Sequence, residues 1–403
     1  MSHACGAFVS GYKFDEGSTV NQTLDQQRLE AFLGQALTDT GAALSVCLAT
    51  IGDRLGLYRA MAGAGPLTPA ELAARANLAE RYVREWLNNQ AAGGYVAYDP
   101  DSGTYELPPE QAACLADDDS PTNVQGGFEA TAACFAILDR LAAAFRTGEG
   151  IGWHEHDAHV FRGVERFWAP AYRSQLVSTW IPALDGVAEK LEAGARVADV
   201  GCGHGISTIV MAEAFPRSTF VGFDYHDASI ARAREAAIGS GLDSRVRFEV
   251  AGAKDFPGQY DLVCLLDCFH DMGDPVGAGR HVREALAPGG TVLLAEPRAG
   301  DEPQDNFNPL GRALYGFSTL LCTPTSLSQD VGLALGACAG PARLRQGPRR
   351  GWIPSRSPGG RDAGERRPRS AALSAAARRA HHVGRTFVHN GSVGRDREGA
   401  NGP

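Results

Sequence analysis

Apolar residues are spaced differently in the two halves of this chain, and the two spacings predict different structures. From Leu24 to about Met61 they recur mostly at intervals of three and four residues, which is typical of helix. Residues 121 to about 192 also look mainly helical. Beyond residue 193, short apolar runs alternate with helical patterns, which predicts a parallel sheet with right-handed crossovers. The predicted strands are 196–201, 218–224, 245–250, 260–267 and 290–296.

Two short helices and a hairpin are predicted between these regions. Thr68, Pro69 and Glu71 suit the N-cap, first and capping-box positions of one helix, and residues 80–87 form the next. Turn residues then separate two strand-like runs, as in a β-hairpin. This order is typical of a winged helix. The two strand-like runs are 93–98 and 104–107.

Charge on the predicted winged helix argues against a nucleic-acid partner. Arg81 and Arg84 are offset by Glu80 and Glu85, and the wing tip carries aspartates and no Lys or Arg. DNA phosphates require the opposite charge, and the net charge of the chain is -9. We therefore favour a structural or dimerisation role for this domain, with a homodimer formed through the N-terminal helices.

Composition places the chain among soluble globular proteins. Its 403 residues leave room for two domains, and 44% are hydrophobic. We find no secretory leader and no apolar run near the roughly 18 residues of a membrane span, so we expect a cytoplasmic protein without a membrane partner. Nine cysteines without a C-x-x-C pair suit reduced thiols. His154, His156 and His159 suit a solvated surface, and we expect no metal.

The strongest candidate site is a glycine-rich turn after the first strand of the sheet. Gly201, Gly203 and Gly205 alternate there, and Asp199 precedes them. This carboxylate would repel a pyrophosphate but would suit a ligand with an ammonium or sulfonium group. Asp224 ends the next strand, about 20 residues on, where a carboxylate commonly binds ribose hydroxyls.

These motifs resemble the cofactor site of the Rossmann-like S-adenosylmethionine-dependent methyltransferases, over about residues 160 to 340. With the helical segment before it, the chain is similar to bacterial methyltransferases that carry an N-terminal winged-helix domain, and more distantly to small-molecule O-methyltransferases. The resemblance implies S-adenosylmethionine as cofactor and a small molecule as acceptor. The cofactor-binding residues that it implies are Asp199, Gly201, Cys202, Gly203, His204, Gly205, Asp224, Tyr225, Ala253, Lys254, Asp255 and Asp267.

A histidine just past the fourth strand is the candidate catalytic base. Methyl transfer from a sulfonium needs an in-line nucleophile and often a base that takes its proton. Residues 266–274 resemble the O-methyltransferase motif in which a His-Asp pair is followed by Trp, although Met272 replaces the Trp here. The resemblance implies that His270 is the base and Asp271 its neighbour. Alternatively, His270 caps the strand or binds a backbone carbonyl.

The predicted fold class is α/β, a Rossmann-like methyltransferase sheet with a mainly helical, winged-helix N-terminal domain. The aromatic and cationic residues of 161–172 would suit a lid over the cofactor, or simply interdomain packing. Two other functions stay open, a cofactor-sensing DNA-binding regulator and a damaged, non-catalytic relic. The predicted parts are a loose arm (1–25), a winged-helix domain (26–120), a helical connector and lid (121–192), a methyltransferase domain (193–345) and a basic tail (346–403).

The tail differs from the rest of the chain in composition. Residues 341–403 hold 14 Lys and Arg against 4 Asp and Glu, whereas the preceding residues hold 24 against 43. A basic disordered tail for nucleic acid is one interpretation. The resembling fold, however, ends in two further strands, and we find none here. Back-translation with GC-favouring codons, shifted by one nucleotide, yields a helix end, a glycine in place of Trp352 and two strand-like runs.

We therefore expect that residues from about 346 onward are a frameshifted translation, and that resequencing the gene will locate the shift there. An intact frame would refute this hypothesis. If the tail is real in the cell, an apolar sheet edge is left unpaired, and the protein should be less stable or prone to aggregate.

Overall fold

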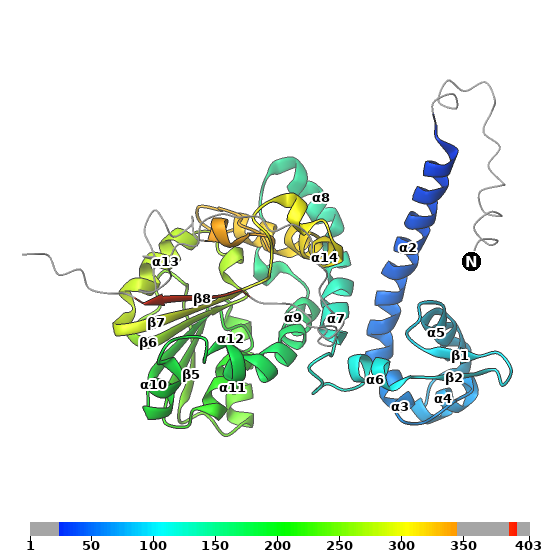
Figure 1. Ribbon diagram of the computed structural model, residues 1–403, viewed down its shortest axis with the longest axis horizontal. Helices are drawn as coiled ribbons and strands as arrows, with labels where there is room; N and C mark the ends of the chain where they lie inside the picture. The colour runs from blue at the N-terminus through cyan, green and yellow to red at the C-terminus, as the bar shows by residue number, and fades with distance from the viewer. Residues whose placement is uncertain (1–23, 345–386, 393–403) are drawn as a thin grey trace, which may run out of the picture. The chain divides into compact units, whose positions relative to one another are not determined.

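The structure is a computed structural model that describes residues 24–344 and the backbone of 387–392. It divides into two compact units, one up to Ala132 and the other from Ala133 onward (Figure 1). The predicted arm up to residue 23 and most of the tail lie outside the described residues. The helices and strands of the first unit are α2 (Gln26–Arg54), α3 (Leu57–Met61), α4 (Pro69–Ala76), α5 (Glu80–Ala92), β1 (Ala97–Asp99), β2 (Thr104–Glu106), α6 (Pro109–Leu115) and α7 (Gln125–Cys134), the last crossing the boundary.

The helix-turn-helix and hairpin predicted from the sequence are present in the first unit. Thr68 caps α4 in a capping box, in which the Thr68 amide donates to the Glu71 carboxylate over 2.7 Å. Strands β1 and β2 pair antiparallel and form the hairpin. Leu72 of α4 and Leu87 of α5 are fully buried in the core beneath them, and Trp86 donates its indole N–H to the Leu48 carbonyl of α2 over 2.8 Å. This unit is therefore a winged-helix domain.

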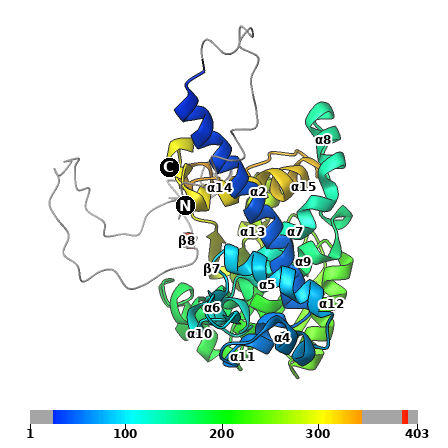
Figure 2. The same ribbon diagram turned by 90° about the vertical axis from the view of Figure 1, so that its right-hand side faces the viewer.

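Helix α2 extends well beyond the rest of the first unit (Figures 1 and 2). Its buried residues all lie between Ser45 and Asp53, whereas Phe32, Leu37 and Leu44 are each more than half exposed. By length and composition alone, α2 is also apolar enough to cross a membrane. The expectation that no apolar run approaches this length is therefore wrong, although length and composition by themselves are weak evidence of a span.

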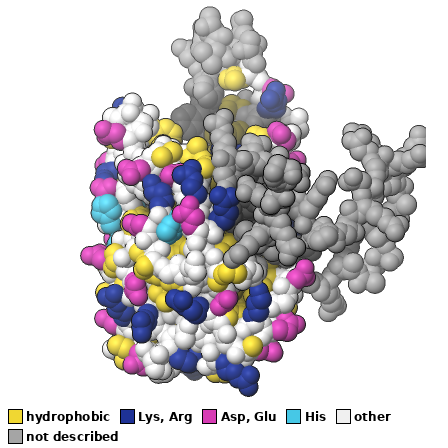
Figure 3. Space-filling view, turned by 90° about the vertical axis from the view of Figure 1, so that its left-hand side faces the viewer, with side chains coloured by type: hydrophobic (Ala, Val, Ile, Leu, Met, Phe, Trp, Pro, Cys, Tyr) yellow, Lys and Arg dark blue, Asp and Glu magenta, His cyan; other side chains and the backbone are white. Residues whose placement is uncertain are grey.

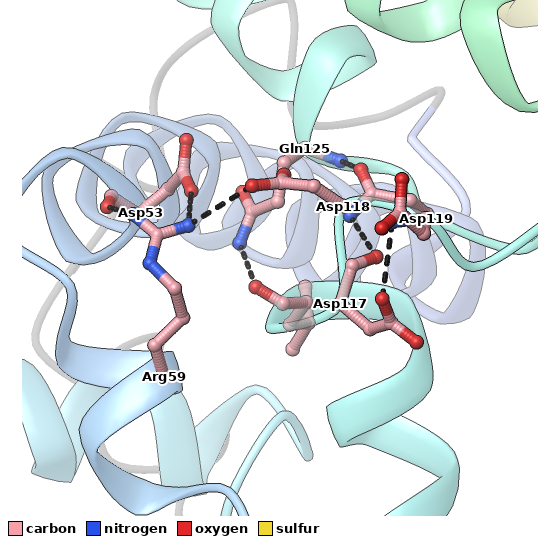
Figure 4. A network of polar contacts seen from close by, with 8 residues as sticks. Asp53, Arg59, Asp117, Asp118, Asp119 and Gln125 are labelled. Carbon is pink, nitrogen blue, oxygen red and sulfur yellow. Dashed lines mark hydrogen bonds and ion pairs between the residues drawn. The ribbon is translucent and has the colours of Figure 1, made fainter.

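The stretch 107–120 after the hairpin contains helix α6 and three consecutive aspartates, and it contacts its own unit. The Arg59 guanidinium lies 3.2 Å from the Asp53 carboxylate and 3.5 Å from Asp118 (Figure 4). It also donates to the Asp53 carbonyl over 2.8 Å. Gln125 donates to the Leu115 carbonyl over 2.9 Å. These contacts hold the segment against the end of α2.

The second unit is built on a six-stranded sheet of order β5-β4-β3-β6-β7-β8, in which only the pairing of β8 is antiparallel. Its first five strands lie where the alternating pattern predicts them, except that the last begins a few residues earlier. The predicted parallel Rossmann-like sheet is confirmed. Its strands are β3 (Arg196–Val200), β4 (Thr219–Asp224), β5 (Val246–Val250), β6 (Tyr260–Leu266), β7 (Leu286–Glu296) and β8 (Phe387–Ser392).

Helices cover both faces of this sheet, so successive residues of a strand enter different cores. Val197 packs against helices on one face, and Ala198 packs into the core on the other. Helices α10 to α12 lie on the first face and α13 on the second. The helical segments of this unit are η1 (Phe135–Ile137), α8 (Leu138–Thr147), η2 (Trp153–Glu155), α9 (Ala158–Ala171), η3 (Tyr172–Trp180), α10 (Val187–Ala193), α11 (Ile206–Ala214), α12 (Asp227–Gly239), η4 (Phe269–Asp271), α13 (Pro275–Glu284), η5 (Pro303–Asn306), α14 (Pro309–Phe317), η6 (Ser318–Cys322) and α15 (Thr323–Leu327).

Strand β8 corrects one expectation about the tail. We found no strand there from the sequence, yet 387–392 pairs antiparallel with β7, with Asn390 opposite Leu293. The backbone of the β7 edge is therefore paired. The frameshift hypothesis stays a prediction, because the other residues from 346 onward lie outside the described part of the chain.

Candidate active site

The glycine-rich turn joins β3 to α11 and needs its glycines. Gly201, Gly203 and Gly205 have φ angles of +75°, +52° and +83°, a region that side chains rarely adopt. A Cβ at Gly205 would meet the Phe248 ring at 2.4 Å, and one at Gly201 would meet Cys268 at 2.7 Å. At Gly203, by contrast, no atom of the described residues, apart from the glycine and its two chain neighbours, lies within 4 Å of the Cβ position. The backbone there is open to close approach by a ligand.

Asp199 lies beneath this turn, near the carboxyl end of β3, and is only 1% exposed. One carboxylate oxygen accepts hydrogen bonds from the hydroxyls of Ser207 and Thr208, each over 2.6 Å. Burial raises the pKa of Asp199, and these two hydrogen bonds act against the rise. The first turn of α11 therefore holds the carboxylate in place.

Asp224 ends the neighbouring strand and is hydrogen-bonded to the same turn. Its carboxylate accepts the amide N–H groups of Gly203 and His226, each over 2.9 Å. Burial raises the pKa of Asp224, and these two amides partly offset the rise. The negative charge of Asp224 also raises the pKa of Asp199. The structure thus brings together the two acids and the glycine turn, as the sequence predicted.

The other predicted cofactor residues lie on the loops around this turn. Tyr225 follows Asp224 and is 46% exposed. Ala253, Lys254 and Asp255 form a turn after β5, and the Lys254 ammonium lies 3.5 Å from the carboxylate of Asp274 on the loop before α13. The remaining predicted cofactor residue is Asp267, just past β6, with a left-handed φ of +56°.

Helix α9, which contains most of the stretch 161–172 predicted as a lid or as interdomain packing, contacts these loops. The Glu165 carboxylate lies 2.8 Å from the His204 imidazole, and the Trp168 side chain hydrogen-bonds Asp267. The Phe161 ring lies 4.9 Å from the His226 ring, measured between centroids. The aromatic and cationic residues of this stretch were the sequence signal, but the partners of Glu165 and Phe161 were not predicted. Its predicted role as a lid stays a proposal.

His270 lies on the short helix η4 after β6 and is 3% exposed. Its Nδ1 is hydrogen-bonded to the Glu296 carboxylate at the end of β7, which also accepts the Phe269 amide over 2.9 Å. On the other side of the ring, Nε2 lies 3.3 Å from Asp271. The ring nitrogens therefore face carboxylates and not the backbone carbonyl of the alternative interpretation. The sequence suggested Asp271 as a neighbour but not the Glu296 partner.

These two carboxylates control the protonation of the imidazole. Burial by itself lowers the pKa of His270, but Asp271 and Glu296 outweigh it and hold the pKa well above its ordinary value. The charged imidazolium is thus the stable form in the resting site. A base at this position becomes available only when the pH rises far enough to remove that proton.

Cys322 of η6 completes the group around His270. The ligand atoms of His270, Asp271 and Cys322 lie within 4.8 Å of one another. No other such metal-ligand group occurs in the described parts of the chain, so His154, His156 and His159 do not converge there. His156 is instead buried with neither ring nitrogen hydrogen-bonded.

We expect Glu296→Gln to lower the pKa of His270, because the imidazolium loses an anionic partner. Carbon-13 histidine labelling and NMR titration will measure it, with the exposed Glu213→Gln as control. The pKa of His270 is higher in the folded than in the unfolded protein. The interaction of its imidazolium with Glu296 therefore stabilises the fold fully below the unfolded pKa of about 6.5, and this stabilisation is lost as the pH rises through the folded pKa. The difference in stability between the unchanged protein and the Glu296→Gln variant should therefore be larger at pH ~6 than at alkaline pH. An unchanged His270 titration would contradict this assignment.

Two family models match this chain. Residues 42–117 match the Rv2258c-like winged HTH domain, and residues 191–317 match the methyltransferase domain. The chain therefore carries a winged helix-turn-helix domain followed by a methyltransferase domain, in agreement with the fold. The second match includes the glycine turn, both acids and His270.

Individual relatives agree with this assignment. The 27-O-demethylrifamycin SV methyltransferase of Amycolatopsis mediterranei is 34% identical over 26% of this chain and 40% of its own length. A ubiquinone biosynthesis O-methyltransferase of Pseudomonas aeruginosa is 31% identical over 26% and 44%. The match thus spans less than half of the length of each of these relatives.

Solved structures share the fold over more of the chain. An O-methyltransferase family protein from Burkholderia thailandensis has a TM-score of 0.57 at 18% identity, covering 78% of this chain and 91% of its own. An O-methyltransferase from neocarzinostatin biosynthesis, solved with S-adenosyl-L-homocysteine and 1,4-dihydroxy-2-naphthoic acid, has a TM-score of 0.52 at 21% identity, covering 78% and 90%.

Proposed function

We propose that this chain, a winged-helix domain joined to a methyltransferase domain, transfers the methyl group of S-adenosylmethionine to a hydroxyl group of a small molecule. One observation carries the proposal. The sheet brings a glycine turn with the buried Asp199 and the half-buried Asp224, suited to the cofactor, to the same edge as a buried histidine held by Glu296, suited to an acceptor. Ligands of open parallel sheets bind at this carboxyl edge.

The residues around the glycine turn fit the cofactor. Asp199 suits the ammonium and sulfonium charges, the open backbone at Gly203 allows close approach, and Asp224 suits the ribose hydroxyls. When bound, the cofactor supplies an electrophilic methyl group on sulfur. What remains for the protein is to hold the acceptor in line, exclude water and take the hydroxyl proton.

His270 is the group that we propose takes this proton. Glu296 fixes the ring through Nδ1, so that Nε2 is the atom left to accept a proton, beside Asp271. Because the two carboxylates raise the pKa of His270, the neutral base forms only at higher pH. We therefore expect O-methylation to be faster at alkaline pH, where a neutral His270 can take the proton of the acceptor hydroxyl.

The acceptor class is proposed from the relatives. One structural neighbour was solved with a dihydroxynaphthoic acid, whose hydroxyl groups are aromatic, and the two relatives are a 27-O-demethylrifamycin SV methyltransferase and a ubiquinone biosynthesis O-methyltransferase. An aromatic hydroxyl is acidic enough for a histidine base. We therefore propose a hydroxylated aromatic small molecule as the acceptor.

We expect Asp224→Ala to weaken the binding of S-adenosyl-L-homocysteine about 10- to 100-fold, because the ligand loses hydrogen bonds to a charged group and the Gly203 amide loses its acceptor. Calorimetric titration of the purified protein measures this. Asp227→Ala, which removes an exposed carboxylate in the first turn of α12, should leave the affinity unchanged. Equal losses in both variants would count against the assignment.

Replacing His270 by Ala should lower turnover by about 100-fold or more and leave affinity for S-adenosyl-L-homocysteine within about twofold, since only proton transfer is lost. The acceptor screen would use hydroxylated aromatic compounds. In the unchanged protein, turnover should rise with pH through the raised pKa of His270. Unchanged turnover in the variant would discard the role as base.

The exposed apolar face of α2 supports a homodimer. We propose that Phe32, Leu37 and Leu44 pack against a second copy of this chain, which would remove them from water. Light scattering should give twice the mass of one chain, and Leu37→Glu should halve it, whereas Gln35→Glu on the same helix should not. A monomeric unchanged protein would remove this proposal. Cytoplasmic location stays a prediction.

The DNA-binding regulator gains no support from the winged helix. Arg81 is paired with Glu85, and Arg84 with Glu80 over 2.6 Å, so both cations of α5 are already neutralised. Figure 3 shows Lys, Arg, Asp and Glu side chains interspersed on one face of the second unit, without a continuous basic patch. We therefore keep a structural role for the winged helix.

A further inference from the structure

We propose that His270, Asp271 and Cys322 bind a divalent ion of the zinc class. An imidazole nitrogen, a carboxylate oxygen and a thiol sulfur lie within 4.8 Å of one another, although Cys322 comes from η6 and the other two residues from η4. These are the three ligand types that zinc takes in proteins. The closeness of the three atoms comes from packing and not from a spacing in the sequence.

The imidazole is already oriented as a metal ligand would be. Its Nδ1 is hydrogen-bonded to Glu296, which fixes the ring and directs Nε2 toward Asp271. Histidines that bind metals almost always donate their other N–H to a carboxylate or carbonyl in this way. Glu296 is 1% exposed and takes a second hydrogen bond from the Phe269 amide, so this orientation is rigid.

The other two ligands lie at a partly accessible position and would supply negative charge once Cys322 has lost its thiol proton to a bound metal. Asp271 Oδ1 is buried without a hydrogen bond, and its 3.3 Å separation from His270 Nε2 lacks hydrogen-bond geometry. The Asp271 side chain as a whole is 24% exposed, which leaves a route for an ion. A thiolate and a carboxylate would neutralise a divalent ion, and the sulfur ligand favours zinc over magnesium or calcium.

Occupancy would compete with the base role proposed for His270. A metal bound at Nε2 uses the lone pair that would take the acceptor proton. Binding also requires loss of the imidazolium and thiol protons, so affinity should rise with pH. Metal binding can be measured without cofactor or acceptor, and its outcome is therefore separate from that of the methyl-transfer proposal.

The test uses cobalt(II) as the probe on the purified, metal-stripped full chain. We expect a near-ultraviolet thiolate-to-cobalt charge-transfer band that saturates at one equivalent and disappears on addition of zinc(II). Cys322→Ser should abolish the band, whereas Cys47→Ser, a thiol of the first unit, should retain it. No band in the unchanged protein, or an equal band in the Cys322→Ser variant, would overturn the site.

Glu296→Gln provides a second measurement that does not remove a ligand. Loss of the carboxylate that orients His270 should weaken cobalt binding about 10- to 100-fold while the charge-transfer band at saturation is kept. Far-ultraviolet circular dichroism confirms that each variant is folded. An unchanged affinity in a folded Glu296→Gln variant would show that His270 is not a ligand.

Discussion

Asp199, Asp224 and Glu296 lie at the carboxyl edge of the sheet, and the donors that satisfy these three carboxylates determine the structure around each of them. Asp199 takes two hydroxyl groups from the start of α11, and Asp224 takes two backbone amides. Glu296 takes a backbone amide and the His270 ring. An unpaired buried charge would cost several kcal/mol, so each acid constrains the turn beside it.

The same hydrogen bonds connect the two halves of the proposed site. The Gly203 amide joins the turn after β3 to the acid after β4, and Glu296 joins the turn after β6 to the end of β7. Asp267 extends this connection to α9 through Trp168. A ligand on the glycine turn and an acceptor at His270 would therefore lie on one rigid edge, which suits a transfer between two bound molecules.

The first unit has a different organisation. Its winged helix is closed by its own core and by the contacts of Arg59, whereas much of α2 lacks a covering surface within the described residues. The charges on α5 are paired within the helix. These features favour an architectural use of the domain, with α2 as the surface available for another chain.

The sequence alone determined the elements whose signals are local. The Thr68–Glu71 capping box, the strands up to β7 and the glycine turn with its two acids could all be predicted, because each depends on residue type and spacing within a few positions. The cofactor class was implied by the resemblance of this turn to the cofactor site of a known family. Length and periodicity also located α2, although not its exposure.

Only the tertiary structure decided which distant residues meet. Glu296 lies 26 positions from His270, and Glu165 lies 39 from His204, and no periodic pattern links such pairs. Cys322 gave no sequence signal for its place beside His270. Periodicity reports which face of an element is buried, whereas the partners of a buried polar group depend on how whole elements pack. The protonation of His270 therefore became predictable only once both neighbouring carboxylates were located.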